Sequence, residues 1–528
     1  MPTYLCYDLK GIQEFIFAIP RLRYVIGGSA LIDRFDREFA PSHHGPTLQY
    51  VFSGGGKGCY RCADEASADT LQAELRREAH RIGLSIAFGR NNTYSLAVEQ
   101  IDAVYPCLPD PQSLDGHPCA VSGAWPVASS SAISEIANRR CYDRGKLPMR
   151  RIDDELIAAI YMPKGFEGKD AAFFHNVNAE TGNGEDVDAA EDKLAGRAGA
   201  AALGNRNRWA VICMDGNSMG TQIAAASRSL TDEGLIEWIK NMSAAVNDCC
   251  RSACISAMHE VVIDWVASAG IAEIMSHCCL PDGTVVLPIR PLVLGGDDMI
   301  VLCHSAHAFT FVEEVSRAFT DKSRASEYGP LWRGTGGELS ISAGMLFCST
   351  SMPLAAAVSY AEQLLANAKQ HGQMLTESDR ATPACVDWEV VTESVIDTPS
   401  ARRQRNLQFK DRDIDQVVRV TQKPYQMSQL ETLRRSRSAM AYRNLPRGIT
   451  HKLREILVQP YWDRRLSVAS IGKQQPALAV DVDEGNDLAN PTGRWTLTNG
   501  VRSIDVLDIV EMIEEGLRLE RPTVMAGS

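Results

Sequence analysis

The chain has 528 residues, a length that exceeds one ordinary hydrophobic core and predicts roughly three or four domains. Its 45% hydrophobic and 23% charged residues are typical of a soluble globular protein. The net charge of −12 argues against a protein that coats nucleic acid by general electrostatics, so any such contact should be local or shared with partner subunits.

The start of the chain, "MPTYLCYDLKGIQEFIF", lacks the basic and apolar regions of a secretory signal. No run of about 18 apolar residues occurs along the chain, which argues against a membrane span. We therefore expect a cytoplasmic protein that does not contact membranes.

The cysteines are predicted to be reduced thiols in the core. Fifteen is an odd number, and several lie in apolar runs such as "AVICMD". Cys59 and Cys62 form a CxxC without a second such pair at zinc-ribbon distance. A further cluster has enough ligands but no standard spacing, so zinc is not expected there: Cys249, Cys250, Cys254, Cys278 and Cys279.

Residues 1–102 are predicted to form the first α/β domain. Apolar strands are expected in "TYLCYDLK", "LQYVFSG" and "LSIAFGRNN", and "ADTLQAELRREAHRIG" has the mixed polarity of a surface helix. The first strand ends near Asp8, and the second runs into the turn Gly54-Gly55-Gly56-Lys57. The following segment, 103–205, is rich in Pro, Ser, Gly and Asp and is predicted to be a linker.

Residues 206–396 repeat the pattern of the first domain. The strands "WAVICMDG", "RPLVLGGDDMIVLCH" and "LSISAGMLFC" appear in the same order as their counterparts, with helical segments between them. Two copies of one β-α-β-β-α-β unit explain this repetition. Only the second copy has an acidic pair at its glycine turn, Asp297 and Asp298, in addition to Asp215 at a strand end.

Three carboxylates at neighbouring strand ends favour a divalent cation and a triphosphate. Side-by-side carboxylates repel unless a cation, usually Mg²⁺ (or Mn²⁺), lies against them. Two such ions can activate an attacking hydroxyl and stabilise departing pyrophosphate. Gly295 and Gly296 leave room for a base and ribose, and backbone N–H groups of the turn Gly216–Gly220 could face phosphates.

Lys369 completes this predicted site. It lies near the end of an amphipathic helical pattern, "PLAAAVSYAEQLLANAKQHG", from which it could reach the triphosphate as a point charge. Taken singly, an Asp-Asp turn, an Asp-Gly-Asn turn and a late helical lysine each have ordinary structural explanations. Their joint occurrence favours a site that polymerises or cyclises nucleotides.

These motifs resemble the large, polymerase-like subunit of type III CRISPR effector complexes. The resemblance is carried by "DLKGIQEFIF", "FSGGGK", "MDGNSMG", "LGGDD", "ISAGMLF" and "AEQLLANAK", and it extends over most of the chain. It implies an α+β fold with two ferredoxin-like palm domains of the GGDEF-cyclase type and a C-terminal helical bundle. It also implies that ATP is joined into cyclic oligoadenylates, second messengers of antiviral defence, when target RNA is bound.

Residue by residue, the resemblance implies catalytic and metal-binding roles for Asp215, Asp297 and Asp298. The nucleotide-binding residues of the second palm that it implies are Gly295, Gly296, Ser218 and Lys369, and the turn itself adds Gly216 and Asn217 through its backbone N–H groups. The first palm faces the second in this family, so Ser53, Gly54 and Gly55 could hold a second, acceptor ATP.

The chain departs from the family at two places. Many members begin with an HD-type nuclease domain, whereas this sequence starts on the first palm strand, so we expect no DNase activity. A zinc element often lies between the palms, but here only Cys119 and Cys141 of its ligands remain, which again argues against zinc. The resemblance therefore fits an HD-less type III subunit or a related stand-alone cyclase.

Residues 397–528 are predicted to form a C-terminal helical domain. The composition becomes basic with a helical period, and "IDVLDIVEMIEEGLRLE" has amphipathic spacing. Contact with guide or target RNA and with small subunits of an effector complex is weighed equally against a solvated helical face, and a homo-oligomer is left open. Two further alternatives remain: a cyclase that makes a cyclic dinucleotide or uses another NTP, and a catalytically idle scaffold of an RNA-guided complex.

Overall fold

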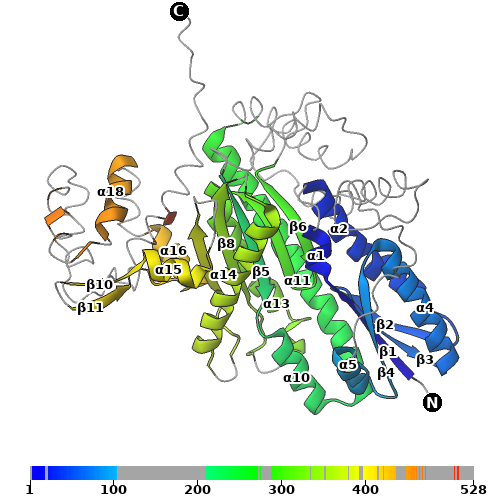
Figure 1. The fold of residues 1–528 in the computed structure, drawn as a ribbon. Coiled ribbons are helices and arrows are strands. Elements are labelled where there is room, and N and C mark those ends of the chain that lie inside the picture. Colours follow the sequence, from blue (N-terminus) through cyan, green and yellow to red (C-terminus); the bar gives the residue numbers. More distant parts are fainter. Residues whose placement is uncertain are drawn as a thin grey trace, which may run out of the picture.

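The computed structural model describes the two predicted palms and parts of the C-terminal region (Figure 1). The described residues are 3–17, 22–103, 208–270, 274, 287–332, 335–349, 352–377, 380–391, 397–412, 415–419, 421–435, 447–457, 459–460, 463, 466–467, 470, 505 and 508–509. The predicted linker 103–205, with Cys119 and Cys141, lies outside these residues apart from its first position, as do Cys278 and Cys279.

The first palm is a four-stranded antiparallel sheet with the strand order β2-β3-β1-β4. This order, with helices after β1 and β3, is the predicted β-α-β-β-α-β unit. Its elements are β1 (Thr3–Lys10), α1 (Ile12–Phe17), α2 (Leu22–Arg34), η1 (Phe35–Phe39), α3 (Ala40–Ser42), β2 (Leu48–Gly54), β3 (Lys57–Cys62), α4 (Glu65–Ile82), β4 (Ser85–Asn91) and α5 (Tyr94–Ala103).

The second palm repeats this order within a six-stranded sheet, β12-β9-β8-β5-β7-β6. Strands β6, β7, β5 and β8 correspond to β2, β3, β1 and β4, and β9 adds a parallel strand beside β8. Its elements are β5 (Arg208–Gly216), α10 (Met219–Ser229), α11 (Asp232–Ala269), β6 (Ile289–Gly295), β7 (Asp298–His304), η4 (Ser305–His307), α13 (Ala308–Ser323), η5 (Gly329–Leu331), β8 (Ile341–Ser349), α14 (Leu354–Leu375) and β9 (Cys385–Val390).

Local signals in the sequence set the ends of the helices. Asp64 precedes α4 and its carboxylate accepts a hydrogen bond of 2.8 Å from the N–H of Ser67, while Gly83 ends the helix at φ 88°. Thr231 caps the 38-residue helix α11 in the same way, accepting from Gly234. Such caps satisfy backbone groups that a helix end would otherwise leave unpaired.

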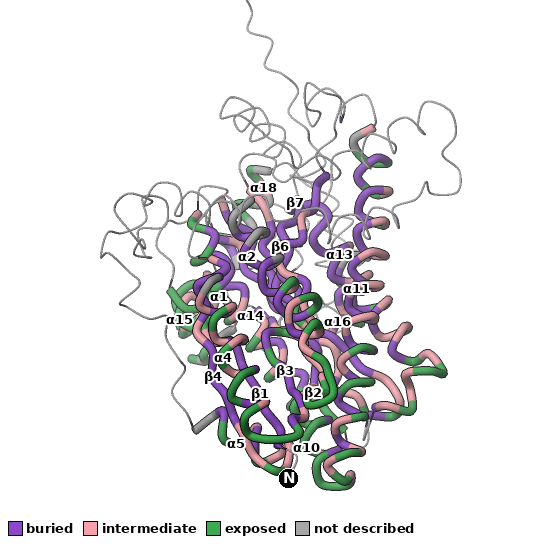
Figure 2. The backbone as a smooth tube through the Cα atoms, turned by 90° about the vertical axis from the view of Figure 1, so that its right-hand side faces the viewer, coloured by how far each residue is buried: buried purple, intermediate pink, exposed green. Residues whose placement is uncertain are grey.

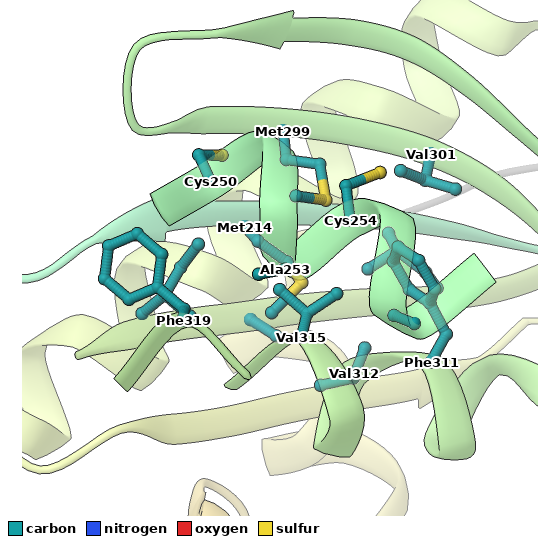
Figure 3. Packing of buried hydrophobic residues seen from close by; sticks show 14 of the residues in the cluster. Met214, Cys250, Ala253, Cys254, Met299, Val301, Phe311, Val312, Val315 and Phe319 are labelled. Atoms are coloured by element: carbon teal, nitrogen blue, oxygen red, sulfur yellow. The ribbon is translucent and has the colours of Figure 1, made fainter. Parts of the chain in front are cut away.

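The two faces of the second sheet are both covered. Alternate residues of β5 and β7, such as Met214 and Met299, pack against α11 and α13 (Figure 3). The intervening residues, such as Cys213 and Ile300, face the opposite way and pack with α14 and with the helices of the first palm. Figure 2 shows the resulting buried layer, and the ten cysteines among the described residues are all buried thiols within it or its counterpart in the first palm.

The palms lie side by side (Figure 1). Helix α2 of the first palm contacts β6 of the second, and α11 of the second contacts β2 of the first. One hydrophobic cluster includes buried residues of both palms, among them Leu5, Val25, Leu292 and Leu364. Burial of this shared surface fixes the two glycine turns relative to each other.

The region after residue 397 contains strands as well as the expected helices. The short strand β12 (Tyr425–Gln426) pairs with β9 and so extends the sheet of the second palm. The two β-branched residues of β11, Val417 and Val418, favour a strand over a helix. The elements here are α15 (Pro399–Asn406), β10 (Gln408–Asp411), β11 (Gln416–Arg419), β12, α16 (Met427–Arg435) and α18 (Arg447–Leu457). None of the helices that the structure describes is both long and apolar enough to span a bilayer.

Candidate nucleotidyl-transfer site

Asp215 and Asp298 lie at adjacent ends of the central strands β5 and β7. The two strands are antiparallel with Met214 opposite Met299, so each carboxylate lies one residue beyond this pair. Because side chains alternate along a strand, both follow the face that is covered by α14 rather than the face of the two methionines. The sheet therefore brings together residues that are 83 positions apart.

Asp297 lies in the turn just before Asp298 and reaches back over Gly216. A Cβ atom built on Gly216 would come within 3.0 Å of the Asp297 Cβ and within 2.6 Å of the Met219 Cε. Asp297 and Asp215 are also close enough to share a hydrogen bond between their carboxyl groups. A glycine after Asp215 is thus required for the acidic turn to approach it.

The pKa values of Asp297 and Asp298 are both raised. Burial among the surrounding protein atoms is the largest cause in each case, and the neighbouring charge of Asp215 is the second. Asp298 nevertheless keeps a solvent-exposed face, so a ligand can reach it. Like-charge repulsion in a partly desolvated site is the environment that a divalent cation relieves.

Lys369 contacts the acidic group from α14. Its ammonium forms an ion pair with Asp215 and donates a hydrogen bond of 2.9 Å to the Gly216 carbonyl. Its charge also lowers the pKa of Asp298, whereas burial and the charge of Asp215 raise it. The structure therefore brings Lys369 into contact with Asp215 and near Asp298.

The carboxylates of this site fit a Mg²⁺ ion that is bound together with a nucleotide. Among the described residues, no group of three His, Cys, Asp or Glu side chains is arranged to hold a metal ion. Mg²⁺ is usually held by one or two carboxylates, with phosphate oxygens and waters as the remaining ligands. The adjacent carboxyl groups of Asp215 and Asp297 supply that smaller set, and the ion pair with Lys369 occupies part of it in this structure.

The glycine turn between β6 and β7 is open on its outer side. Gly296 has φ 63°, a left-handed conformation that L side chains rarely adopt. A Cβ atom added to either Gly295 or Gly296 would meet nothing within 4 Å. The space over these two residues can hold a flat group such as a nucleobase against the backbone.

Hydrogen bonds to Ser340 and Thr382 hold the turn after Asp215 in place. Asn217 is buried, and its amide donates a hydrogen bond of 2.7 Å to the Ser340 hydroxyl. Ser218 has φ 64°, and its hydroxyl lies 2.7 Å from that of Thr382. The side chain of Asn217, predicted to bind nucleotide, therefore anchors the turn in this structure, while Ser218 begins α10 without capping it.

The first palm has the same turn with different chemistry. Gly54 pairs with Lys57 just as Gly295 pairs with Asp298, so Lys57 takes the place of an acidic residue. Gly55 is exposed at φ 62°, and Gly54 faces α11 with Ser243 3.6 Å from its added Cβ. The Ser53 hydroxyl donates to the Asp36 carbonyl, so this residue secures the turn to η1.

Residues of the first palm also reach the acidic site. The charge of Lys57 lowers the pKa of Asp298, although burial and Asp215 together outweigh it. Gln13 of α1 donates a hydrogen bond of 2.6 Å to Glu362 of α14. Glu362 in turn raises the pKa of Asp298, which places a fourth carboxylate near the site.

Sequence reasoning missed Glu362, Lys57 and Gln13 as parts of this environment. Glu362 precedes Lys369 by seven residues, two helical turns, so both lie on one face of α14 and this spacing could have identified it. The positions of Lys57 and Gln13 depend on the packing between palms, which no local pattern encodes.

Comparison with known proteins assigns the second palm to a described family. Residues 208–375 match the second palm domain of Cas10/Cmr2, so this segment is a palm of that type and the predicted resemblance is confirmed there. A comparison with curated proteins finds no match.

Solved structures share the fold at low identity. Csm1 of T. onnurineus is 13% identical, with a TM-score of 0.50 over 98% of this chain and 69% of its own. A Csm1–Csm4 cassette in complex with cA4 is 13% identical with a TM-score of 0.47, covering 98% of this chain and 70% of the other. The cassette with one ATP is 14% identical with a TM-score of 0.48 and the same coverage.

Proposed function

We propose that the chain is a nucleotidyltransferase that joins ATP into cyclic oligoadenylates with release of pyrophosphate. The observation that carries the proposal is the group formed by Asp215, Asp297, Asp298 and Lys369 beside an open glycine turn, within a palm of the Cas10/Cmr2 type. Cyclic oligoadenylate as the product follows from the family resemblance of the sequence.

The chemistry assigns each part of the site a task. In each joining step a 3′-hydroxyl oxygen forms a bond to the α-phosphorus of a second nucleotide, the hydroxyl loses its proton, and pyrophosphate leaves. Lys369 would neutralise the triphosphate, and Gly295 and Gly296 would lie against the base or ribose. Mg²⁺ held by Asp215 and Asp297, with phosphate oxygens and waters as its other ligands, would supply charge stabilisation of the phosphoryl group.

Each palm would contribute to binding one of two nucleotides. The acidic turn of the second palm would bind the nucleotide whose α-phosphate reacts, and Ser53, Gly54 and Gly55 would form the side of the acceptor. Lys57 and Gln13 support this arrangement because they connect the first palm to the acidic site. Guide or target RNA and small effector-complex subunits are part of the proposal as activating partners.

The test is a product assay. The purified protein is incubated with each labelled NTP and Mg²⁺ or Mn²⁺, with and without RNA, and the products are resolved by mass. We expect cyclic oligoadenylate from ATP, and its loss in Asp297→Ala and Asp298→Ala. Asp321→Ala, which removes an exposed carboxylate on α13, is the matched control and should retain activity.

Other outcomes select the alternatives. A cyclic dinucleotide, or a product from another NTP, would replace the substrate or product in the proposal while keeping the site. Absence of any nucleotide product, including in a reconstituted complex with RNA, would leave the idle scaffold as the function.

A further inference from the structure

A buried carboxylate lies beneath the glycine turn of the first palm. Asp36 is 5% exposed and belongs to η1, a π-helical segment that follows α2. Among the described residues it has no ion pair, in contrast to most buried carboxylates, which are paired. It is also outside the acidic site of the second palm, so the proposed reaction does not account for it.

Asp36 forms hydrogen bonds with the glycine turn of the first palm. One carboxylate oxygen accepts a hydrogen bond of 2.7 Å from the Gly56 N–H, and the other lies 3.5 Å from the Tyr7 hydroxyl. The Asp36 carbonyl accepts from Ser53, whose hydroxyl also lies 2.8 Å from that of Tyr50. Asp36 therefore binds both sides of the turn, at Ser53 and at Gly56.

The turn itself has little freedom to adopt another shape. Gly55 and Gly56 have φ values of 62° and 79°, which favour glycine. A Cβ atom on Gly56 would come within 2.4 Å of the Ile12 Cδ1, and the Gly56 carbonyl accepts from the Leu9 N–H at 2.8 Å. With its N–H held by Asp36 as well, Gly56 is fixed on both sides, and Lys57 follows it directly.

The comparison with the second palm shows what this arrangement changes. Register places Gly56 where the second palm has Asp297, and Lys57 where it has Asp298. In the second palm the carboxylate belongs to the turn itself, where Asp297 approaches Gly216 and Asp215. In the first palm a carboxylate approaches from inside, and the outward position next to it has a lysine instead.

We propose that Asp36 is a positioning residue, which holds the Gly54–Lys57 turn as a phosphate-facing loop and directs Lys57 toward the acidic site. The ligand class is the triphosphate of the second nucleotide, so the inference rests on the proposed function. Register supports it, because Lys57 lies opposite Gly54 as Asp298 lies opposite Gly295, and its charge lowers the pKa of Asp298. A lysine at this position can bind phosphate if the turn keeps it in place.

The experiment measures binding, so it does not depend on turnover. A non-hydrolysable ATP analogue with Mg²⁺ is titrated calorimetrically into the full chain. We expect two sites for the unchanged protein. Lys57→Ala and Asp36→Ala should each weaken the second site about tenfold and leave the first unchanged. The double variant should be no weaker than Lys57→Ala, because both act through one group.

Two variants separate positioning from stability. Asp64→Ala removes the N-cap of α4 in the same palm and should lower the melting temperature without affecting the second site. Asp36→Asn retains an acceptor for the Gly56 N–H and should restore most of the affinity lost in Asp36→Ala. If Asp36→Ala does not fold, Asp36→Asn is tested in its place.

The outcomes distinguish this inference from the proposed function. Two sites with the expected losses but no product in the NTP assay would overturn the proposed function and retain the role of Asp36 in binding. Unchanged second-site affinity in Asp36→Ala, or additive losses in the double variant, would overturn the positioning role. A single site in the unchanged protein would overturn it as well.

Discussion

Asp297 and Asp298 couple protons to metal binding in a way that can be measured. Their raised pKa values mean that the folded chain holds protons that the unfolded chain has released above the ordinary aspartate value of 3.8. The metal-free protein therefore loses stability from this pair as the pH rises toward and past neutrality. Mg²⁺ must displace the same protons, so its binding strengthens with pH.

We expect a fixed excess of Mg²⁺ to raise the melting temperature more at pH 8 than at pH 6. Asp36, whose pKa burial raises to about 7, adds to the pH trend of the metal-free protein, but it lies in the first palm. Asp297→Asn combined with Asp298→Asn should abolish the pH dependence of the Mg²⁺ effect. Equal Mg²⁺ shifts at both pH values in the unchanged protein would contradict the assignment.

Gly295 tests whether the open turn accommodates a nucleotide. A Cβ atom there meets nothing within 4 Å, so Gly295→Ala should change the free energy of unfolding by less than about 0.5 kcal/mol. If a nucleotide lies against the turn, the same methyl group should weaken binding of an ATP analogue about tenfold. Calorimetric titration and urea unfolding of one sample provide both values.

Gly216→Ala is the matched variant, with the opposite expectation. Its methyl group would collide with Asp297 and Met219, so it should lower turnover and perturb Mg²⁺ binding in addition to stability. A Gly295→Ala protein that is as stable and binds nucleotide as tightly as the unchanged protein would place the nucleotide elsewhere.

At the scale of elements, α14 lies directly on β8 at a glycine. A Cβ atom on Gly344 would come within 2.2 Å of the Ala361 carbonyl oxygen. Gly89 of β4 is its counterpart, opposite Cys6 as Gly344 is opposite Cys213, and its added Cβ would lie 1.8 Å from the Ala97 carbonyl oxygen. Each glycine lets the following helix approach a palm sheet closely.

This pair yields a prediction with an internal control. Gly344→Ala and Gly89→Ala should each destabilise the protein by about 1–3 kcal/mol, because a backbone must shift in both. Only Gly344→Ala displaces the helix that carries Lys369, so only it should greatly reduce nucleotidyl transfer. Urea unfolding and the product assay are compared for the two, and equal activity losses would contradict the role of α14.

The same elements show how far the sequence predicts the structure. The two β-α-β-β-α-β units follow from strand patterns, since "LSIAFG" and "LSISAG" align up to the glycine that the following helix covers. The acidic turn follows from its glycines and carboxylates. Asp36 could not be predicted, because it lies in a helical segment whose ordinary surface pattern says nothing about the turn packed above it. Likewise, β12 could not be predicted, because a strand of two residues is too short to show an alternation of apolar and polar residues.

At the scale of the whole molecule, buried ion pairs join the second palm to the region after residue 397. Arg403 of α15 donates hydrogen bonds of 2.6 Å to both Asp387 and Glu389 of β9. Lys423 is 5% exposed and lies 3.0 Å from Asp508. Asp505 accepts hydrogen bonds of 2.7 Å from Thr421 and Tyr425.

This network predicts that the C-terminal residues unfold together with the second palm. Burial alone would lower the pKa of Lys423, but the charges of Glu389, Asp508 and Asp505 raise it, so the ammonium is stabilised by its neighbours. Lys423 also lies 5.1 Å above the ring centre of Trp388, which stacks on Tyr425. Removing the cation leaves several carboxylates buried without compensation.

Lys423→Met should therefore destabilise the protein by about 3–5 kcal/mol, the cost of breaking a buried ion pair. Lys410→Met is the matched control, since the pair of Lys410 with Asp415 is exposed and should contribute less than about 1 kcal/mol. Urea unfolding followed by tryptophan fluorescence measures both. If the C-terminal region were an independent attachment, Lys423→Met would produce a separate early transition and leave the main one unchanged; a single transition shifted to lower urea would show that the palm and this region unfold together.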